Sequence, residues 1–78
     1  MSYYKQFSTR VRSSDIYKRT VVREAIKKVA PFCKGNFEIP MAAIYEINKD
    51  NRLRKKPVRA SYDYVSEVMY QMLNRNEI

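Results

Sequence analysis

The sequence predicts a mainly α-helical fold, a single small domain of three helices with at most a short β element. Its 78 residues can support only one modest core, because the fraction of surface that folding buries rises with chain length. Apolar residues recur at helical spacing in three segments, whose apolar faces can only be buried against one another. We therefore expect a basic N-terminal arm, residues 1–12, followed by one domain, residues 13–78.

The first helix is expected from residue 16 to residue 30. Just before it, Ser13, Ser14 and Asp15 carry side chains that can accept hydrogen bonds from the free amides of a helix start. Pro31 should end the helix, because proline disfavours helical geometry in the preceding residue. One face is apolar, with Val22, Ala25, Ile26, Val29 and Ala30. The basic residues fall mostly on the opposite, solvated face: Lys18, Arg19, Arg23, Lys27 and Lys28.

The middle of the chain predicts a turn, a short strand and a brief second helix. Phe32 and Cys33 should pack under the core. Residues 34–36 contain a glycine and an asparagine, which tolerate positive φ and favour a turn, and residues 37–39 alternate like a strand. Pro40 suits the first position of a helix. The apolar stripe of this second helix is expected to contain Met41, Ile44, Tyr45 and Ile47.

A third helix is expected after an exposed basic segment, residues 48–57. Ser61 can cap this helix, and Asp63 in its first turn is favourable near the amino-terminal end of the macrodipole. Either Asn74 or Asn76 can adopt the left-handed conformation that closes a helix. The expected buried face consists of Val65, Val68, Met69, Met72 and Leu73. Three tyrosines are expected at the edge of the core: Tyr45, Tyr64 and Tyr70.

The charge of the chain indicates a polyanionic partner. Sixteen Lys and Arg against eight Asp and Glu give a net charge of +8, and the field of such a protein attracts polyanions. Nucleic acid is the commonest of these, although a basic surface also suits an anionic membrane or an acidic protein. The start of the chain has no apolar core of signal-peptide length, and no run is long enough to span a bilayer. We therefore expect a cytoplasmic protein without a membrane partner, or one acting in a host cytoplasm if viral.

The residues that are missing exclude several kinds of chemistry. With no His, one Cys and one Gly, the chain cannot form a structural zinc site, an imidazole base or a glycine-rich phosphate loop. The acid–lysine pairs Glu24 with Lys27 and Glu46 with Lys49 have ordinary helical salt-bridge spacing, not the converging carboxylates of a metal-dependent nuclease. We expect no enzymatic activity, no catalytic residues, no cofactor and no metal. The lone Cys33 fits a reducing compartment.

The order of the expected elements resembles the winged helix-turn-helix family of DNA-binding domains. The resemblance covers roughly residues 15–78, and its closest local likeness is the segment 56–69, which resembles a recognition helix and its approach. It implies that the second and third helices form the DNA-reading unit. The basic segment is longer than the turn of a compact helix-turn-helix, and the chain leaves no room for a wing hairpin. We therefore expect a variant whose wing is reduced or absent.

The candidate DNA-binding residues follow from this resemblance and from the concentration of charge. The amino-terminal end of the third helix is expected to meet bases, and a basic loop of residues 49–59 is expected to contact phosphates, because six cations in eleven residues repel one another unless an anion lies alongside. The base-reading candidates are Arg59, Ser61 and Tyr62. The phosphate candidates are Lys49, Arg52, Arg54, Lys55 and Lys56, with 54–56 as first choices. Arg10 and Arg12 of the arm can reach an adjacent minor groove.

Three functions remain open on the sequence. The first is a small, non-enzymatic regulator of transcription that binds double-stranded DNA, as a homodimer if paired half-sites are needed to read enough base pairs. The second is a small phage or viral type of inhibitor or adaptor that docks on an acidic protein surface of a nucleic-acid enzyme. The third is an RNA-binding protein, which follows from the charge alone because no family signature for RNA is present.

Overall fold

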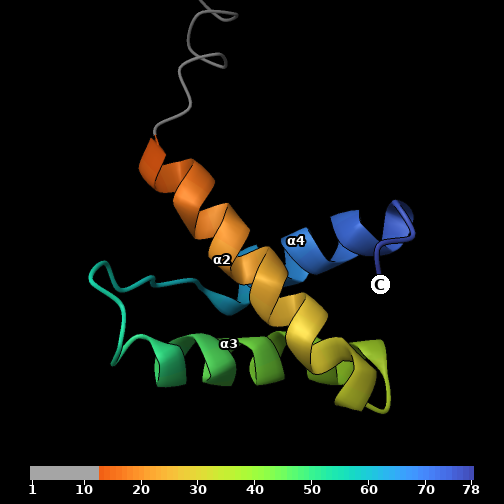
Figure 1. Cartoon of the computed structure of the whole chain (residues 1–78). Coiled ribbons are helices and arrows are strands. Elements are labelled where there is room, and N and C mark those ends of the chain that lie inside the picture. Colours follow the sequence, from red (N-terminus) through yellow and green to blue (C-terminus); the bar gives the residue numbers. More distant parts are fainter. Residues whose placement is uncertain (1–12) are drawn as a thin grey trace, which may run out of the picture.

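Residues 13–78 form three α-helices that pack on one another around a single core (Figure 1). The computed structural model describes residues 13–78, and the arm, residues 1–12, lies outside the described part. The mainly α-helical, three-helix fold class is confirmed. In chain order the elements are α2 (Ser13–Val29), the 3₁₀ turns η1 (Ala30–Phe32) and η2 (Asn36–Glu38), α3 (Ile39–Asp50) and α4 (Tyr62–Asn74).

Helix α2 is longer at its start than predicted. The helix already includes Ser13, so the predicted capping segment lies within the helix and not ahead of it. The predicted end is confirmed: α2 stops at Val29, and the chain continues through Pro31 as a 3₁₀ turn. The buried face is confirmed in its centre, where Val22 and Ile26 are fully buried.

The connection between α2 and α3 differs most from the sequence prediction. The prediction of a strand at 37–39 is wrong, because residues 36–38 form the 3₁₀ turn η2. Residues 13–78 contain no strand with which it could pair. Gly35 has φ of −155°, which is extended and not positive. A Cβ at Gly35 would lie 2.9 Å from the Phe37 ring, but this side chain is 76% exposed and can move away, so the contact does not require glycine. Phe32 is 86% exposed, so its predicted packing under the core is wrong, whereas Cys33 does pack against the core.

Helix α3 turns a face to the core that only partly matches the prediction, since Ile47 is buried and Ile44 packs against the core as predicted. The helix begins at Ile39 with Pro40 in its first turn, and it runs further than predicted, to Asp50. Its buried stripe is Ile39, Ala43 and Ile47, at spacings of four residues. The predicted inward positions of Met41 and Tyr45 are therefore wrong, since both side chains are more than half exposed. Small Ala43 faces the other helices and permits close packing.

Helix α4 follows the prediction closely. The Ser61 hydroxyl accepts a hydrogen bond of 3.1 Å from the amide of Tyr64, which confirms the cap. The predicted face is buried, with Val65, Val68, Met69 and Met72 in the core and Leu73 packed against it. Asn76 has φ of 58° and closes the helix in the left-handed conformation. The core-edge position is confirmed for Tyr64 but wrong for Tyr70, which is 59% exposed.

Three segments that are distant in the sequence meet at one end of the molecule. Helix α2 packs against both α3 and α4, and the connection from α3 to α4 runs beside the first half of α2 (Figure 1). The Tyr17 hydroxyl donates a hydrogen bond of 3.2 Å to the carbonyl of Lys56. The Lys18 ammonium lies 4.5 Å from the ring centre of Tyr64, in the first turn of α4. This end therefore combines the start of α2, the connection and the start of α4.

Candidate nucleic-acid interface

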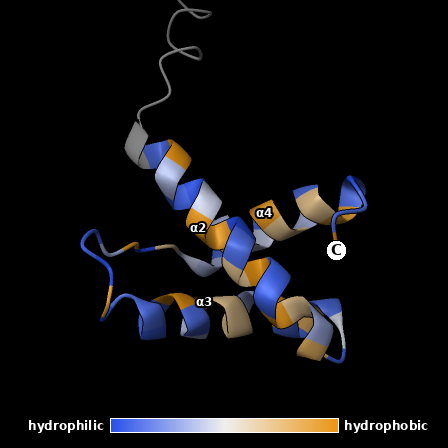
Figure 2. Cartoon of the chain, in the orientation of Figure 1, coloured by the Kyte–Doolittle hydropathy of each residue, from blue (hydrophilic) through white to orange (hydrophobic). Residues whose placement is uncertain are grey.

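The connection between α3 and α4, residues 51–61, carries most of the candidate site and is called the basic loop below. It has five cations, Arg52, Arg54, Lys55, Lys56 and Arg59, and no carboxylate. Figure 2 shows its outermost part as hydrophilic. Lys49, the remaining candidate of the predicted basic segment, lies in the last turn of α3 and not in the loop.

Asn51 clamps the basic loop into one conformation. Its side-chain Nδ2 donates to the carbonyl of Val58 over 2.8 Å, and its Oδ1 accepts from the amide of Val58 over 3.0 Å. Val58 is also buried in the core. The end of the loop that precedes α4 is therefore held both by the Asn51 side chain and by packing of Val58 in the core. No signal in the sequence singles out Asn51, because an asparagine after a helix is commonly only a turn residue.

The side chain of Arg54 stabilises the same loop conformation through hydrogen bonds to Ile47 and Asn51. One nitrogen, Nη1, donates to the carbonyl of Ile47 and to Oδ1 of Asn51, both over 3.1 Å. The other, Nη2, lies 3.9 Å from Oδ2 of Asp50, and the side chain is only 21% exposed. Of the three first-choice phosphate residues, the structure thus gives Arg54 an internal role in shaping the loop.

The other four loop cations point to solvent. Arg52, Lys55, Lys56 and Arg59 are exposed, and within residues 13–78 none of them forms an ion pair. Backbone position is fixed on both sides of Lys55 and Lys56, by Arg54 before them and by Val58 after them. The result is a cluster of unneutralised positive charge on an ordered loop.

The start of α4 adds polar groups beside this cluster, but the rest of the helix does not. The base-reading candidates Ser61 and Tyr62 are exposed and follow Arg59 closely in the chain. Beyond them α4 contains no Lys or Arg, and its exposed face carries the carboxylates Asp63 and Glu67. These carboxylates repel phosphate, and Asp63 lies directly after Tyr62, so only Ser61 and Tyr62 at this end are suited to a polyanion.

The cations of α2 are mostly engaged inside the molecule. Lys18, Arg19 and Arg23 are half-buried, which corrects the prediction of a solvated face, while Lys27 and Lys28 are exposed as predicted. Arg19 donates to Oε1 of Gln71 over 2.6 Å. Arg23 pairs with Oε1 of Glu77 over 2.6 Å, so these two arginines tie α2 to α4 and the C-terminal residues.

Lys28 forms an ion pair that links α2 to α3. Its ammonium lies 2.5 Å from Oε2 of Glu46, whose side chain is only 13% exposed, and Lys49 approaches the other oxygen to 3.6 Å. The hydrogen bond raises the pKa of Lys28 and lowers the pKa of Glu46. The predicted spacing of Glu46 with Lys49 thus belongs to a structural ion pair.

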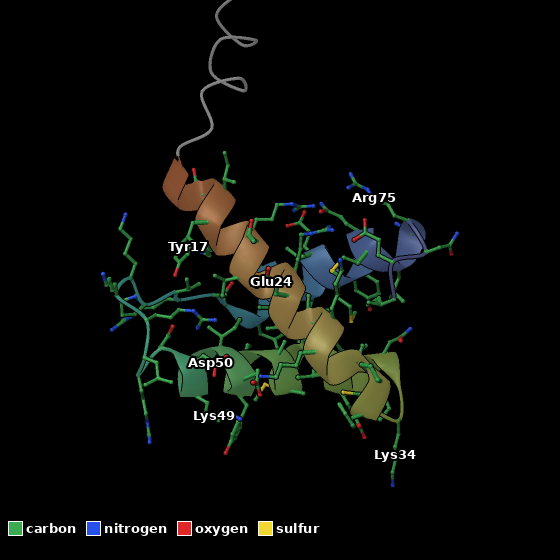
Figure 3. All side chains as sticks on the ribbon, viewed as in Figure 1. Tyr17, Glu24, Lys34, Lys49, Asp50 and Arg75 are labelled. Carbon is green, nitrogen blue, oxygen red and sulfur yellow. The ribbon has the colours of Figure 1, made fainter. Side chains whose placement is uncertain are left out.

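The arm candidates, Arg10 and Arg12, lie outside the described residues. The arm joins the domain at Ser13, one helical turn before Tyr17, whose side chain extends from α2 toward the basic loop (Figure 3). Lys34 lies at the opposite corner of the molecule, beside the turn after α2 (Figure 3). The basic arm therefore enters the fold at the end that carries the basic loop.

Two further features bear on the class of protein. Among residues 13–78, no three His, Cys, Asp or Glu residues lie close enough together to hold a metal ion. In the same part of the chain, no helix combines the length and apolar character needed to cross a membrane. In addition, burial raises the pKa of the Cys33 thiol, which disfavours its thiolate form.

Comparison with known proteins assigns no family to the chain. No family model, no curated protein and no solved structure matches it. The resemblance to winged helix-turn-helix domains therefore stays a prediction. Its weakest point is the connection at residues 51–61, since a compact helix-turn-helix has a turn of about three or four residues.

Proposed function

We propose that this protein binds double-stranded DNA, using the basic loop for the phosphate backbone and the start of α4 for the bases. One observation carries the proposal: four exposed cations that form no ion pair with any of residues 13–78 lie on a loop that Asn51 and Arg54 hold in place. Because the loop is already ordered, binding would not have to offset the conformational entropy of fixing it.

The residues have different roles in this proposal. Lys55 and Lys56 contact phosphates, and Arg52 and Lys49 extend that contact toward α3. Arg59 presents its planar fork to guanine, while Ser61 and Tyr62 hold a phosphate or a base edge nearby. Because the outer face of α4 is acidic, the helix approaches DNA with its amino-terminal end and does not lie along the groove.

The remaining parts of the proposal concern the arm and the setting. Arg10 and Arg12 extend the positive surface from the start of α2, where an adjacent minor groove lies within reach of a flanking arm. We place the protein in the cytoplasm, as a small regulator of transcription. A homodimer would double the number of base pairs read.

The first test measures binding of the full chain to a random DNA duplex by fluorescence anisotropy, from about 50 mM to about 200 mM salt. Each lysine that contacts a phosphate contributes about 0.9 to the slope of log affinity against log salt. The double variant Lys55→Ala/Lys56→Ala should therefore bind more weakly, with a slope smaller by about two. The matched control is Lys27→Ala/Lys34→Ala, which removes two exposed lysines away from the basic loop.

Two outcomes would overturn the proposal. One is DNA binding that is equally insensitive to both double variants while circular dichroism shows both folded. The other is a duplex RNA of the same sequence binding more tightly than the DNA, which would favour the RNA-binding alternative. Base reading is tested separately by selecting binding sites with the wild type and with Arg59→Ala, which should lose preference at one or two positions.

A further inference from the structure

The outer side of α3 carries apolar side chains that no part of residues 13–78 covers. The inner stripe of Ile39, Ala43 and Ile47 is buried, whereas Met41 and Tyr45 are 60% and 66% exposed. Phe32, in the turn before α3, is 86% exposed. Isolated exposed apolar residues are normal, but a group of this size on one face indicates a site of interaction.

The surface here is hollowed on both sides of Tyr45. A groove of about 590 Å³, called the outer groove below, is lined by Met41, Ile44, Tyr45, Asn48, Lys49 and Arg52. A second hollow of about 370 Å³ has Tyr45 and Phe32 among its lining residues. Tyr45 therefore forms a ridge between two concave places, each large enough to receive an apolar side chain. Such a shape fits a helix or an extended segment with regularly spaced apolar residues.

The charges around the outer groove decide which partner fits it. Lys49, 58% exposed, and Arg52, also exposed, line one end. Two carboxylates, Glu38 and Glu46, line the second hollow. Glu46 is 13% exposed and already pairs with Lys28 and Lys49, and Oε1 of Glu38 accepts a hydrogen bond of 3.0 Å from the amide of Lys34. The groove thus combines an apolar floor with cations at its rim, which is complementary to a segment that carries both apolar and acidic side chains.

Charge disfavours one other occupant of the groove, and the kind of side chain that lines it disfavours a second. A second copy of this chain, itself charged +8, would bring its own Lys49 and Arg52 into the interface, where like charges repel. Single-stranded nucleic acid needs flat aromatic platforms among the cations, whereas Met41 and Ile44 supply aliphatic walls. An acidic partner neutralises the rim and covers the floor at once.

We propose that the outer side of α3 binds an acidic amphipathic segment of another protein. Its apolar side chains, spaced about four residues apart, seat in the two hollows beside Tyr45. Its carboxylates pair with Lys49 and Arg52. This surface shares Lys49 and Arg52 with the edge of the proposed DNA-binding site, whereas the main DNA contacts, Lys55, Lys56 and Arg59, do not line the groove. A partner bound here would therefore leave Lys55, Lys56 and Arg59 available to a nucleic acid.

The test selects peptides from a random displayed library against the full chain, then measures the affinity of the selected peptides by fluorescence anisotropy. We expect acidic peptides with apolar residues at helical spacing. Met41→Ser/Tyr45→Ser should weaken their binding by at least about tenfold, as should Lys49→Glu/Arg52→Glu. Peptides in which Lys replaces Glu should regain affinity for the charge-reversed variant. Tyr70→Ser, at an equally exposed aromatic on α4, is the control and should change nothing.

Each other result would overturn the proposal. The proposal is wrong if the selection enriches no peptide, or if the enriched peptides contain no excess of acidic residues. It is also wrong if the enriched peptides bind the groove variants as tightly as they bind the wild type. A dimer in sedimentation that Met41→Ser/Tyr45→Ser dissociates would assign the face to a second copy. Loss of binding to a single-stranded oligonucleotide in that variant would assign it to nucleic acid. Since all the substituted side chains are exposed, the variants should fold, which thermal unfolding checks.

Discussion

The cations of α2 and those of the basic loop are alike in number and type, but the fold treats them differently. In α2, Arg19, Arg23 and Lys28 each meet a partner on another element, at 2.5 to 2.6 Å. In the basic loop, Lys55 and Lys56 meet none within residues 13–78. The comparison teaches that a count of positive charges predicts the sign of a partner, while only the packing decides which charges are available to it.

The cause lies in what each segment packs against. Helix α2 crosses α3 and the C-terminal part of the chain, which present Glu46, Gln71 and Glu77 to its basic side. The basic loop runs at the edge of the fold, and the carboxylate beside it, Asp50, faces Arg54. Substitutions in α2 should therefore lower stability without affecting DNA binding, and substitutions of the exposed loop lysines should do the reverse.

The largest effect is expected where the loop is clamped. Asn51→Ala removes three hydrogen bonds, two to Val58 and one to Arg54, and should lower the free energy of unfolding by roughly 2–3 kcal/mol. Urea denaturation measures this change. Asn48→Ala, at an exposed asparagine of α3, is the matched control and should cost less than about 0.5 kcal/mol. Equal costs for the two variants would show that the clamp does not order the loop.

The next effect separates the two sets of cations directly. Arg23→Met leaves the buried Oε1 of Glu77 without its partner and should cost roughly 1–2 kcal/mol of stability, with no change in the salt dependence of DNA binding. Lys56→Met should change stability by less than about 0.5 kcal/mol and still weaken DNA binding. Urea denaturation and anisotropy on both variants check this. The comparison fails if Arg23→Met weakens DNA binding as much as Lys56→Met does.

A smaller effect is expected from the pair between α2 and α3, and it depends on pH. The pKa of Glu46 is lowered in the folded state, so its charge stabilises the fold above its usual pKa near 4.5, and this contribution is lost as the pH falls through the lowered value. The pKa of Lys28 is raised, so its contribution persists up to its usual value near 10.5 and is lost above it. Glu46→Gln should therefore unfold at lower temperature than the wild type between these limits.

The measurement for Glu46→Gln is thermal unfolding followed by circular dichroism at several pH values. The difference in midpoint from the wild type should shrink toward zero as the pH falls below the folded-state pKa of Glu46, because the wild-type carboxylate is then protonated. Glu24→Gln, at an exposed glutamate of α2 without an ion pair in residues 13–78, is the control. A difference that stays constant through the acid range would contradict the assigned pair.

The smallest effect is expected at the contact between α2 and the start of α4. Lys18→Met removes the cation over the Tyr64 ring but keeps an aliphatic side chain of similar length, and should cost about 0.5 kcal/mol. Urea denaturation measures this cost in Lys18→Met and, as a control, in Lys27→Met, which replaces an exposed lysine. The difference between the two variants gives the contribution of the contact between Lys18 and the Tyr64 ring. If Lys18→Met loses more DNA affinity than Lys27→Met, Lys18 contributes to DNA binding and not only to the stability of the fold.

Much of the fold could be predicted from local patterns. The cap at Ser61, the buried face of α4 and the end of α2 before Pro31 all follow from short-range chemistry, and all three are confirmed. The strand at 37–39 was wrong because an alternation of three residues is too short to distinguish a strand from a 3₁₀ turn. The inner stripe of α3 was missed because apolar residues surround much of that helix, so periodicity alone did not select Ile39 and Ala43 over Met41 and Tyr45.

The sequence by itself determined the sign of the molecule's field, the three amphipathic segments and the chemistry that is excluded, because composition and helical periodicity are local properties. Only the tertiary structure decided that Arg54 acts inside the loop, that Asn51 orders it, and that the side chains of Lys55 and Lys56 form no ion pair in the described part of the chain. Tyr17 and Lys56 meet across a separation of 39 residues, and Arg19 and Gln71 across 52. Such contacts depend on how the helices pack, since no local pattern specifies which distant side chain will lie beside a given cation.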